Sequence, residues 1–200
     1  MKIVVSGDDI LFEELKSCNL GADWHRVASA GDFEHYPDAN AFFNLHPNEN
    51  HQANVPGEIP VFVNSVVVVL GKRQLIRFNG WSGFIANEAW EIAGEVNEKA
   101  QQVLDFLHKK VIHTADEPGF ISPRIIAMII NEAYHAKEEE VSTEGEIDTA
   151  MKLGTNYPHG PFEWATKIGH KNIVDLLQQL SISDKRYTPA PALVKAVQPS

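Results

Sequence analysis

The first turn of the chain carries acidic residues where a phosphate-binding turn needs glycines. The apolar run 2–6 is followed by Gly7, Asp8 and Asp9. A dinucleotide-binding turn has the pattern G-x-G-x-x-G, because its glycines make a tight turn and let the backbone approach the pyrophosphate. Here a single glycine remains, and two carboxylates at the phosphate position would repel a diphosphate. We therefore predict that Gly7 only ends a strand and that no nucleotide binds at this turn.

A polar loop further along contains two histidines, His46 and His51, with Glu49 between them. These are metal-ligand residue types, but a loop offers no rigid helical face to hold them. We interpret both as surface histidines and predict no metal site. The single cysteine, Cys18, excludes an internal disulfide and is typical of a reducing cytosol.

Charge and composition exclude several classes of protein. The 200 residues carry 27 acidic and 17 basic side chains, a net charge of −10. Such a balance argues against binding to nucleic acids or to an anionic membrane surface. No apolar run approaches the ~20 residues of a membrane span, and no signal peptide is recognisable. With 44% hydrophobic residues, the sequence predicts a globular cytoplasmic protein with a full core.

The predicted secondary structure that must position these residues changes from strands to helices along the chain. The first half has short β-branched runs between turns, whereas the second half has helical spacing. Strands are predicted over 2–6, 24–28, 39–45, 59–70, 75–78, 89–93 and 111–113. Helices are predicted over 12–17, 97–109, from 122 to the acidic stretch at 138–140, and over 146–153, 161–168, 172–180 and part of the tail. The predicted domains are therefore an α/β domain, 1–117, and an all-α domain, 118–200.

Three motifs in the second half have family-specific spacing. They are D-E-P-G-F-I-S-P-R over 116–124, E-I-D-T-A-M-K-L-G over 146–154 and Y-P-H-G-P-F-E over 157–163. Together they resemble the C-terminal domain of the 3-hydroxyacyl-CoA dehydrogenases, where the patterns are D-x-P-G-F-[IV]-x-N-R, D-I-D-x-A-M and P-x-G-P-F-E. The resemblance is strong over 115–197 and looser before it. It implies a truncated Rossmann-like domain, shortened at its N-terminal, nucleotide-binding end, followed by the helical dehydrogenase-type domain.

The resemblance also implies a site, and this chain departs from it. The family moves a hydride between a 3-hydroxyacyl-CoA and NAD, with a His as general base and a Glu that orients it. Aligning F-N at 78–79 on the family's H-F-F-N-P puts Ile76 at the His position, and Ile cannot carry a proton. Pro123 replaces the Asn of the N-R pair. The catalytic and NAD sites are therefore predicted to be degenerate.

Other family positions are retained. The orienting glutamate corresponds to Glu91 if the local sequence W-E-I is matched, or to Glu88 if the spacing from F-N is matched. Asn64, Ser65 and Asn79 correspond to substrate-binding positions. We expect no cofactor-binding residue and no metal ligand.

Two functions remain open at this point. In the first, the chain is a pseudoenzyme of acyl-CoA metabolism that binds an acyl-CoA-type ligand and forms a homodimer through its helical domain. Neither nucleic acid nor membrane is an expected partner. In the alternative, it is an active NAD-dependent 3-hydroxyacyl-CoA (3-hydroxybutyryl-CoA) dehydrogenase. Its base would then be His113 or His108, or a partner chain would supply the nucleotide-binding part.

Overall fold

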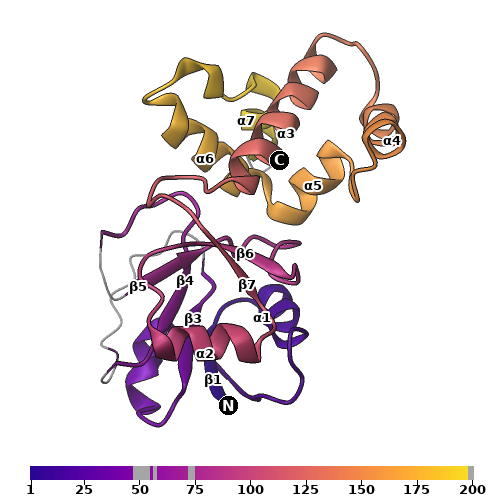
Figure 1. Ribbon diagram of the computed structural model, residues 1–200. Helices are drawn as coiled ribbons and strands as arrows, with labels where there is room; N and C mark the ends of the chain where they lie inside the picture. The colour runs from indigo at the N-terminus through magenta and orange to yellow at the C-terminus, as the bar shows by residue number, and fades with distance from the viewer. Residues whose placement is uncertain (47–54, 56–57, 72–74, 198–200) are drawn as a thin grey trace. The chain divides into compact units, whose positions relative to one another are not determined.

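The computed structural model describes residues 1–46, 55, 58–71 and 75–197. Its contacts divide the chain into two compact units, Met1–Phe120 and Ile121–Ser200. Figure 1 shows that the first unit contains the sheet and that the second is helical. The division follows the change from strand to helix periodicity in the sequence.

A seven-stranded sheet organises the first unit. Its strands are β1 (Lys2–Ser6), β2 (Asp23–Val27), β3 (Ala41–Asn44), β4 (Val61–Asn64), β5 (Leu75–Phe78), β6 (Ala89–Ala93) and β7 (Lys110–His113), in the order β2-β1-β3-β4-β5-β6-β7. Neighbouring strands are parallel except β5 and β6, which are antiparallel. The unit also contains α1 (Asp9–Lys16), α2 (Glu98–Phe106) and the 3-10 helix η1 (Ala30–His35).

The strand order identifies a doubly wound fold that is shorter than the classic one. The chain passes from β1 through α1 to β2, and then crosses to β3 on the other side of β1. The classic order is 3-2-1-4-5-6, with the same reversal beside the first strand. Among the described residues, the strand that would lie beyond β2 is missing. The shortening therefore falls after β2, which lies within the N-terminal, nucleotide-binding half but not before its first strand.

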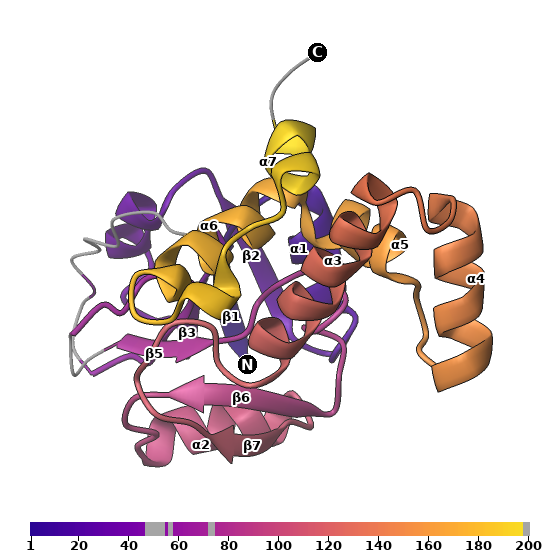
Figure 2. The same cartoon turned by 90° about the horizontal axis from the view of Figure 1, so that it is seen from above.

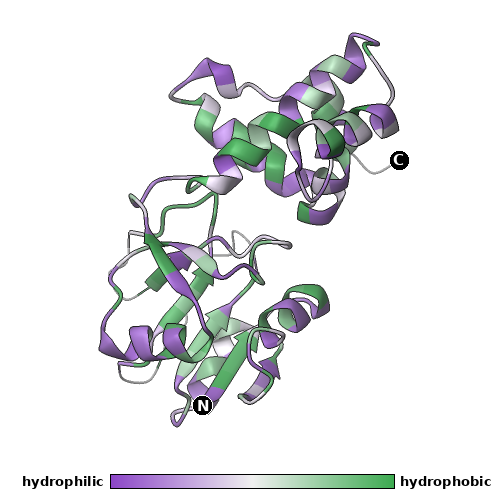
Figure 3. Ribbon diagram, turned by 45° about the vertical axis from the view of Figure 1, so that its right-hand side comes forward, coloured by the Kyte–Doolittle hydropathy of each residue, from purple (hydrophilic) through white to green (hydrophobic). Residues whose placement is uncertain are grey.

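Both faces of the central strands β1, β3, β4, β5 and β6 are buried, as is typical of parallel sheets, whereas the outer strands β2 and β7 are more exposed. Alternate residues along a strand point to opposite faces, so Ile3 and Val5 join one hydrophobic cluster while Val4 joins the other. Phe43 and Phe42 separate in the same way. Figure 3 shows these strands as a hydrophobic centre within the unit.

The strongest predicted strand is shorter than its composition suggests. The run 59–70 was predicted as one strand, but β4 ends at Asn64. The Ser65 hydroxyl donates to the Val68 carbonyl at 2.7 Å and holds a turn there. A local hydrogen bond of this kind competes with sheet pairing, which is why the β-branched residues that follow are not in the sheet.

Five α-helices and a 3-10 helix form the second unit. They are α3 (Ser122–Glu138), α4 (Glu144–Thr155), α5 (Pro161–Ile168), α6 (His170–Ser181), η2 (Lys185–Tyr187) and α7 (Pro191–Val197). Figure 2 shows α3 lying between α5 and α7, and α3 contacts both. Ser122 was predicted as the N-cap of α3, but it is the first helical residue and Ile121 is the cap. Pro123 stands in the first turn, where its missing N–H costs no hydrogen bond.

Asn131 ties α3 to the segment before α7. Its side-chain amide donates to the Thr188 carbonyl at 3.0 Å and accepts from the Ala190 N–H at 2.7 Å. Asn131 is buried, so both of its polar groups need such partners. The described helices include none long and apolar enough to cross a membrane.

Candidate functional site

Polar side chains stand at the carboxyl ends of four neighbouring parallel strands. β1 ends at Ser6, β3 at Asn44 and β4 at Asn64, while Asn79 directly follows β5. All four are buried. Ligands of open α/β sheets bind outside the carboxyl ends of the strands, beside the point where the strand order reverses. We call this row the carboxyl-edge site.

Asn64 holds the strand ends together. Its Nδ2 donates to the Leu45 carbonyl at 3.1 Å, and its Oδ1 accepts from the Gly80 N–H at 3.2 Å. A Cβ at Gly80 would come within 2.7 Å of the Asn64 side chain, so only glycine fits there. The structure therefore gives Asn64 a positioning role, linking the ends of β3, β4 and β5.

Ser65 stands beside a buried charge that the sequence analysis missed. The Ser65 carbonyl accepts from Nε of Arg77 at 2.9 Å. Arg77 is 2% exposed, forms an ion pair with Asp116 and lies 5.0 Å from the ring centre of Phe120. Burial lowers the pKa of Arg77, and the neighbouring Asp116 carboxylate opposes that shift. An arginine inside the apolar strand L-I-R-F was the signal for a paired charge, since isolated charges are rarely buried.

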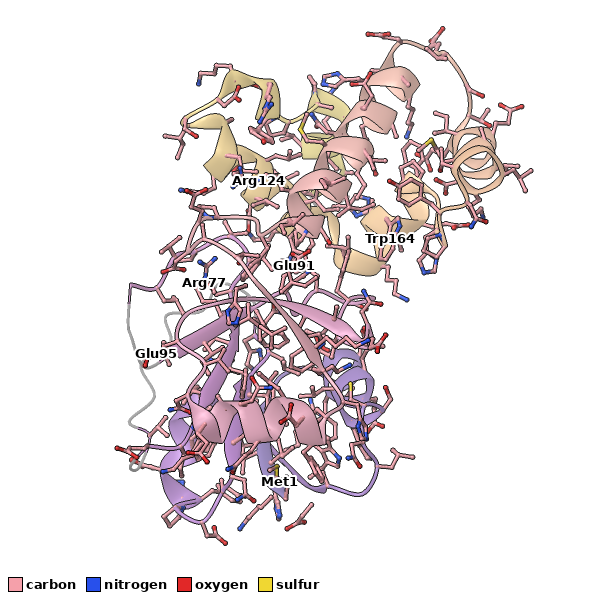
Figure 4. The ribbon with its side chains drawn as sticks, in the orientation of Figure 1. Met1, Arg77, Glu91, Glu95, Arg124 and Trp164 are labelled. Carbon is pink, nitrogen blue, oxygen red and sulfur yellow. The ribbon has the colours of Figure 1, made fainter. Side chains whose placement is uncertain are left out.

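Asp116 and Phe120 are the first and last residues of the D-E-P-G-F motif. Their contacts with Arg77 show that this part of the motif holds β5 against the end of the first unit. Arg124, the last residue of the longer motif, lies in the helical unit, 6.0 Å from the ring centre of Tyr187 (Figure 4).

The structure separates the two glutamate candidates. Glu91 is buried on β6, and its carbonyl accepts from the Asn79 N–H at 3.2 Å. The antiparallel register of β5 and β6 thus places Asn79 and Glu91 opposite each other, with side chains on one face. Glu88 lies on the surface, where a 2.6 Å ion pair with Lys110 lowers the pKa of Glu88. Of the two, Glu91 is the one that the sheet brings beside Asn79.

The register of β6 and β7 does not place His113 beside Glu91. β6 pairs Glu91 with Ile112, and the next residues, Ile92 and His113, pair with each other. Successive residues face opposite sides of a sheet, so His113 and Glu91 lie on different faces. His108 precedes β7 and is exposed. Ile76, at the position aligned with the catalytic histidine, is buried in the hydrophobic core.

Side chains of the protein already fill the hydrogen-bonding groups of the turn between β1 and α1. Asp8 is the N-cap of α1, and its carboxylate accepts from the Leu11 N–H at 2.8 Å. Arg26, near the end of β2, donates to the Gly7 carbonyl at 2.8 and 3.1 Å and forms an ion pair with Asp9. The positive N-terminus of α1 thus already has an anionic partner.

A dinucleotide would place its pyrophosphate at this helix N-terminus. The residues present do not fit that group, because the Asp8 carboxylate lies where the phosphate would be bound and the Asp9 carboxylate is next to it. A Cβ at Gly7 would come within 2.8 Å of Leu45, so the glycine serves the packing of β1 against β3.

The most specific motifs of the helical unit have a structural role. Both oxygens of Asp148 accept backbone N–H groups in the first turn of α5, from Phe162 at 2.8 Å and Glu163 at 3.2 Å. A Cβ at Gly160 would come within 2.3 Å of Asp148. The E-I-D and G-P-F-E segments are therefore spaced to cap α5.

Among the described residues, no group of three or more His, Cys, Asp or Glu side chains is arranged to hold a metal ion. His46 follows β3, but His51 and Glu49 lie outside the described residues.

The order of the strands and the polar residues at their carboxyl ends define the class of protein. It has a shortened Rossmann-like unit followed by a helical unit of the dehydrogenase type. Residues 119–199 match the model of the family "3-hydroxyacyl-CoA dehydrogenase, C-terminal domain". The helical half of the chain is thus similar to the C-terminal domain of the 3-hydroxyacyl-CoA dehydrogenases, which confirms the predicted resemblance, and the predicted fold class is confirmed as well.

Particular relatives share this half. A 3-hydroxyadipyl-CoA dehydrogenase of Escherichia coli (strain K12) is 43% identical over 97 residues, which are 48% of this chain and 20% of that protein. A 3-hydroxybutyryl-CoA dehydrogenase of Bradyrhizobium diazoefficiens is 39% identical over 103 residues, 50% of this chain and 35% of that protein. The matched part is therefore about a fifth to a third of these relatives' length.

A solved structure matches the fold of nearly the whole chain. The crystal structure of M. tuberculosis FadB2 has a TM-score of 0.75 at 12% identity, covering 98% of this chain and 92% of that one. At this identity, the likeness shows that the order of elements is shared along both units.

Proposed function

We propose that this protein is a member of the 3-hydroxyacyl-CoA dehydrogenase family that binds an acyl-CoA-type ligand and lacks NAD-dependent catalysis. The observation that carries the proposal is the turn between β1 and α1. There Asp8 supplies the anionic partner that a bound pyrophosphate would otherwise provide. A nucleotide would have to displace that cap and overcome the repulsion of Asp9.

The loss of a general base supports the same proposal. Ile76 belongs to the core, and His113 lies on the opposite face of the sheet from Glu91. A positioned base contributes about 10²–10⁴-fold in rate, and Ile76, at the position aligned with the catalytic histidine, cannot carry a proton.

In this proposal the carboxyl-edge site, together with Glu91 on β6 and Ser65 after β4, retains the ligand-binding role. Asn79 and Glu91 would contact the polar part of the ligand, whereas Asn64 and Ser65 fix the strand ends around them. The side chain of Asn79 makes a long hydrogen bond to the Trp81 N–H, 3.4 Å, which a ligand can replace at little cost.

The homodimer belongs to the proposal as well. Among the apolar side chains of α3 and α6, Ile173, Leu176, Leu177 and Leu180 are buried, but Ile125 is 54% exposed. Leu153 on α4 and Ile182 are also exposed. The proposed interface in this unit rests on these three exposed apolar side chains. A single 22.3 kDa species in sedimentation at micromolar concentration would refute it.

The alternative proposal is an active NAD-dependent 3-hydroxyacyl-CoA dehydrogenase with a rearranged site or a partner chain that supplies the nucleotide-binding part. The names of the relatives that match the helical half favour it. It requires the Asp8 cap to open or the nucleotide to bind elsewhere.

Binding and turnover assays separate the two. NADH and acetoacetyl-CoA are titrated separately while the fluorescence of the four tryptophans is followed. We expect acetoacetyl-CoA to bind, NADH to leave the fluorescence unchanged, and NADH absorbance to show no turnover. Saturable NADH quenching with turnover near ~1 s⁻¹, the ordinary enzyme range, would establish the alternative.

Glu91→Gln and Glu88→Gln form a matched pair of variants for the ligand site. We expect the first to weaken acetoacetyl-CoA binding and the second, which removes a surface carboxylate, to leave it unchanged. Equal affinities of the two variants would show that the ligand does not contact Glu91.

A further inference from the structure

The helical unit contains a groove of about 530 Å³ that is separate from the carboxyl-edge site. Residues of all five α-helices of this unit line it, from α3 to α7. Its volume lies within the range of small-molecule sites, roughly 300–1,000 Å³. The groove is therefore large enough for a ligand of about ten heavy atoms.

The inner part of the groove is aromatic and apolar. Tyr134 and Phe162 are buried, with ring centres 4.9 Å apart. The ring of His170 stands edge-on to Tyr134, and Ala192 and Ala196 of α7 complete the lining. Such a surface favours an alkyl or aryl body, because burying it removes apolar area from water.

The rim carries one positive charge that its neighbours do not compensate. Lys137 forms an ion pair with Glu144, so these two charges cancel. Lys195 is exposed and forms no ion pair with any of the described residues. In a chain with a net charge of −10, this rim is a local exception that attracts an anion.

The remaining polar pair is neutral. The Tyr134 hydroxyl and Nε2 of His170 are hydrogen-bonded at 2.8 Å. Burial, with the charges of Glu144 and Asp148, raises the pKa of Tyr134 to about 12. Burial also lowers the pKa of His170. The groove thus offers the ammonium group of Lys195, which has no ion-pair partner among the described residues, beside an apolar floor.

We propose that this groove binds a small monoanionic carboxylate with an alkyl or aryl body. The body lies on Tyr134 and Phe162, and the carboxylate lies at Lys195. A polyanion such as a nucleotide diphosphate does not match, because Glu144 stands on the same rim.

The probe is octanoate, titrated calorimetrically into the full chain at pH 7, with octanol and octylammonium as neutral and cationic counterparts. Lys195→Gln removes the rim charge, and Lys167→Gln removes another exposed lysine of the same unit outside the groove. We expect about a three- to fivefold weaker octanoate affinity for Lys195→Gln, the effect of one exposed charge pair, and no change for Lys167→Gln. Ala192→Trp fills the groove and should abolish binding while the far-UV circular dichroism stays that of the parent chain.

Several results would overturn the proposal. They are no octanoate binding at millimolar concentration, equal losses in the two lysine variants, binding that survives Ala192→Trp, or tighter binding of octylammonium than of octanoate. Octanoate that binds only by dissociating a dimer would show that a second copy covers the groove, which also refutes it. Saturating octanoate should leave the acetoacetyl-CoA titration unchanged, so this proposal and the proposed function fail independently.

Discussion

Replacement of Asp148 by alanine tests whether the most specific motif of the chain acts on the fold. Asp148 lies on α4, is 8% exposed and accepts two N–H groups in the first turn of α5. The N-cap residue of α5 is Gly160, which has no side chain to accept these groups. Asp148 thus performs, from a neighbouring helix, the role that a capping side chain usually performs from the N-cap position.

The magnitude follows from the groups left without partners. Loss of a capping side chain costs about 0.5–2 kcal/mol, and loss of a negative charge at a helix N-terminus about 0.3–1 kcal/mol. Phe162 is buried, and an unsatisfied buried N–H costs about 1–3 kcal/mol. These contributions overlap, so we expect Asp148→Ala to reduce the free energy of unfolding by about 2–3 kcal/mol.

Urea unfolding followed by far-UV circular dichroism measures this change. The matched control is Asp175→Ala, which removes a carboxylate of the same unit paired with Lys171 on one helix and should cost about 0.3–0.5 kcal/mol. Asp148→Asn retains one acceptor oxygen and should fall between the two. If Asp148→Ala cost no more than Asp175→Ala, the capping argument would be refuted.

Three further predictions concern the helical unit. Gly160→Ala brings a Cβ within 2.3 Å of Asp148 and should destabilise the protein. Gly154 lies on a helix, and a Cβ there meets nothing within 4 Å, so Gly154→Ala should stabilise the protein by about 0.5–1 kcal/mol. Urea unfolding measures both changes. Gly169 has φ +91°, so Gly169→Val should cost about 1–3 kcal/mol of strain; an unchanged melting temperature would contradict this. The folded state keeps the Tyr134 proton up to about pH 12 and the unfolded state only to about pH 10, so stability should fall as pH rises between these values. Tyr134→Phe should remove that fall, and tyrosinate absorbance of the folded parent chain should show one late-titrating group that the variant lacks.

The sequence by itself predicts most elements of the fold, because their signals are local. Short apolar runs at 2–6 and 41–44 identify strands, and Pro161 and Gly169 mark the two ends of α5. The family motifs are also local, and they identify the helical half. Even the loss of the phosphate-binding turn is visible, since Gly7 is followed by two aspartates.

Local sequence patterns do not predict where a strand ends when a local hydrogen bond competes with sheet pairing. They also do not predict features that depend on the order of the strands in the sheet. The turn held by Ser65 ends β4 early, although the β-branched run continues beyond it. The shortening of the sheet after β2 becomes visible only when the strand order is known.

The tertiary structure alone decides what the candidate residues do, because it brings together segments that are far apart in the chain. The register of β5 and β6 places Glu91 rather than Glu88 beside Asn79. Arg77 and Asp116 are 39 residues apart and form an ion pair in which the arginine is buried and the aspartate is half-exposed. Each such pair depends on how segments are packed, and the periodicity of a single segment reports only which of its own faces is buried.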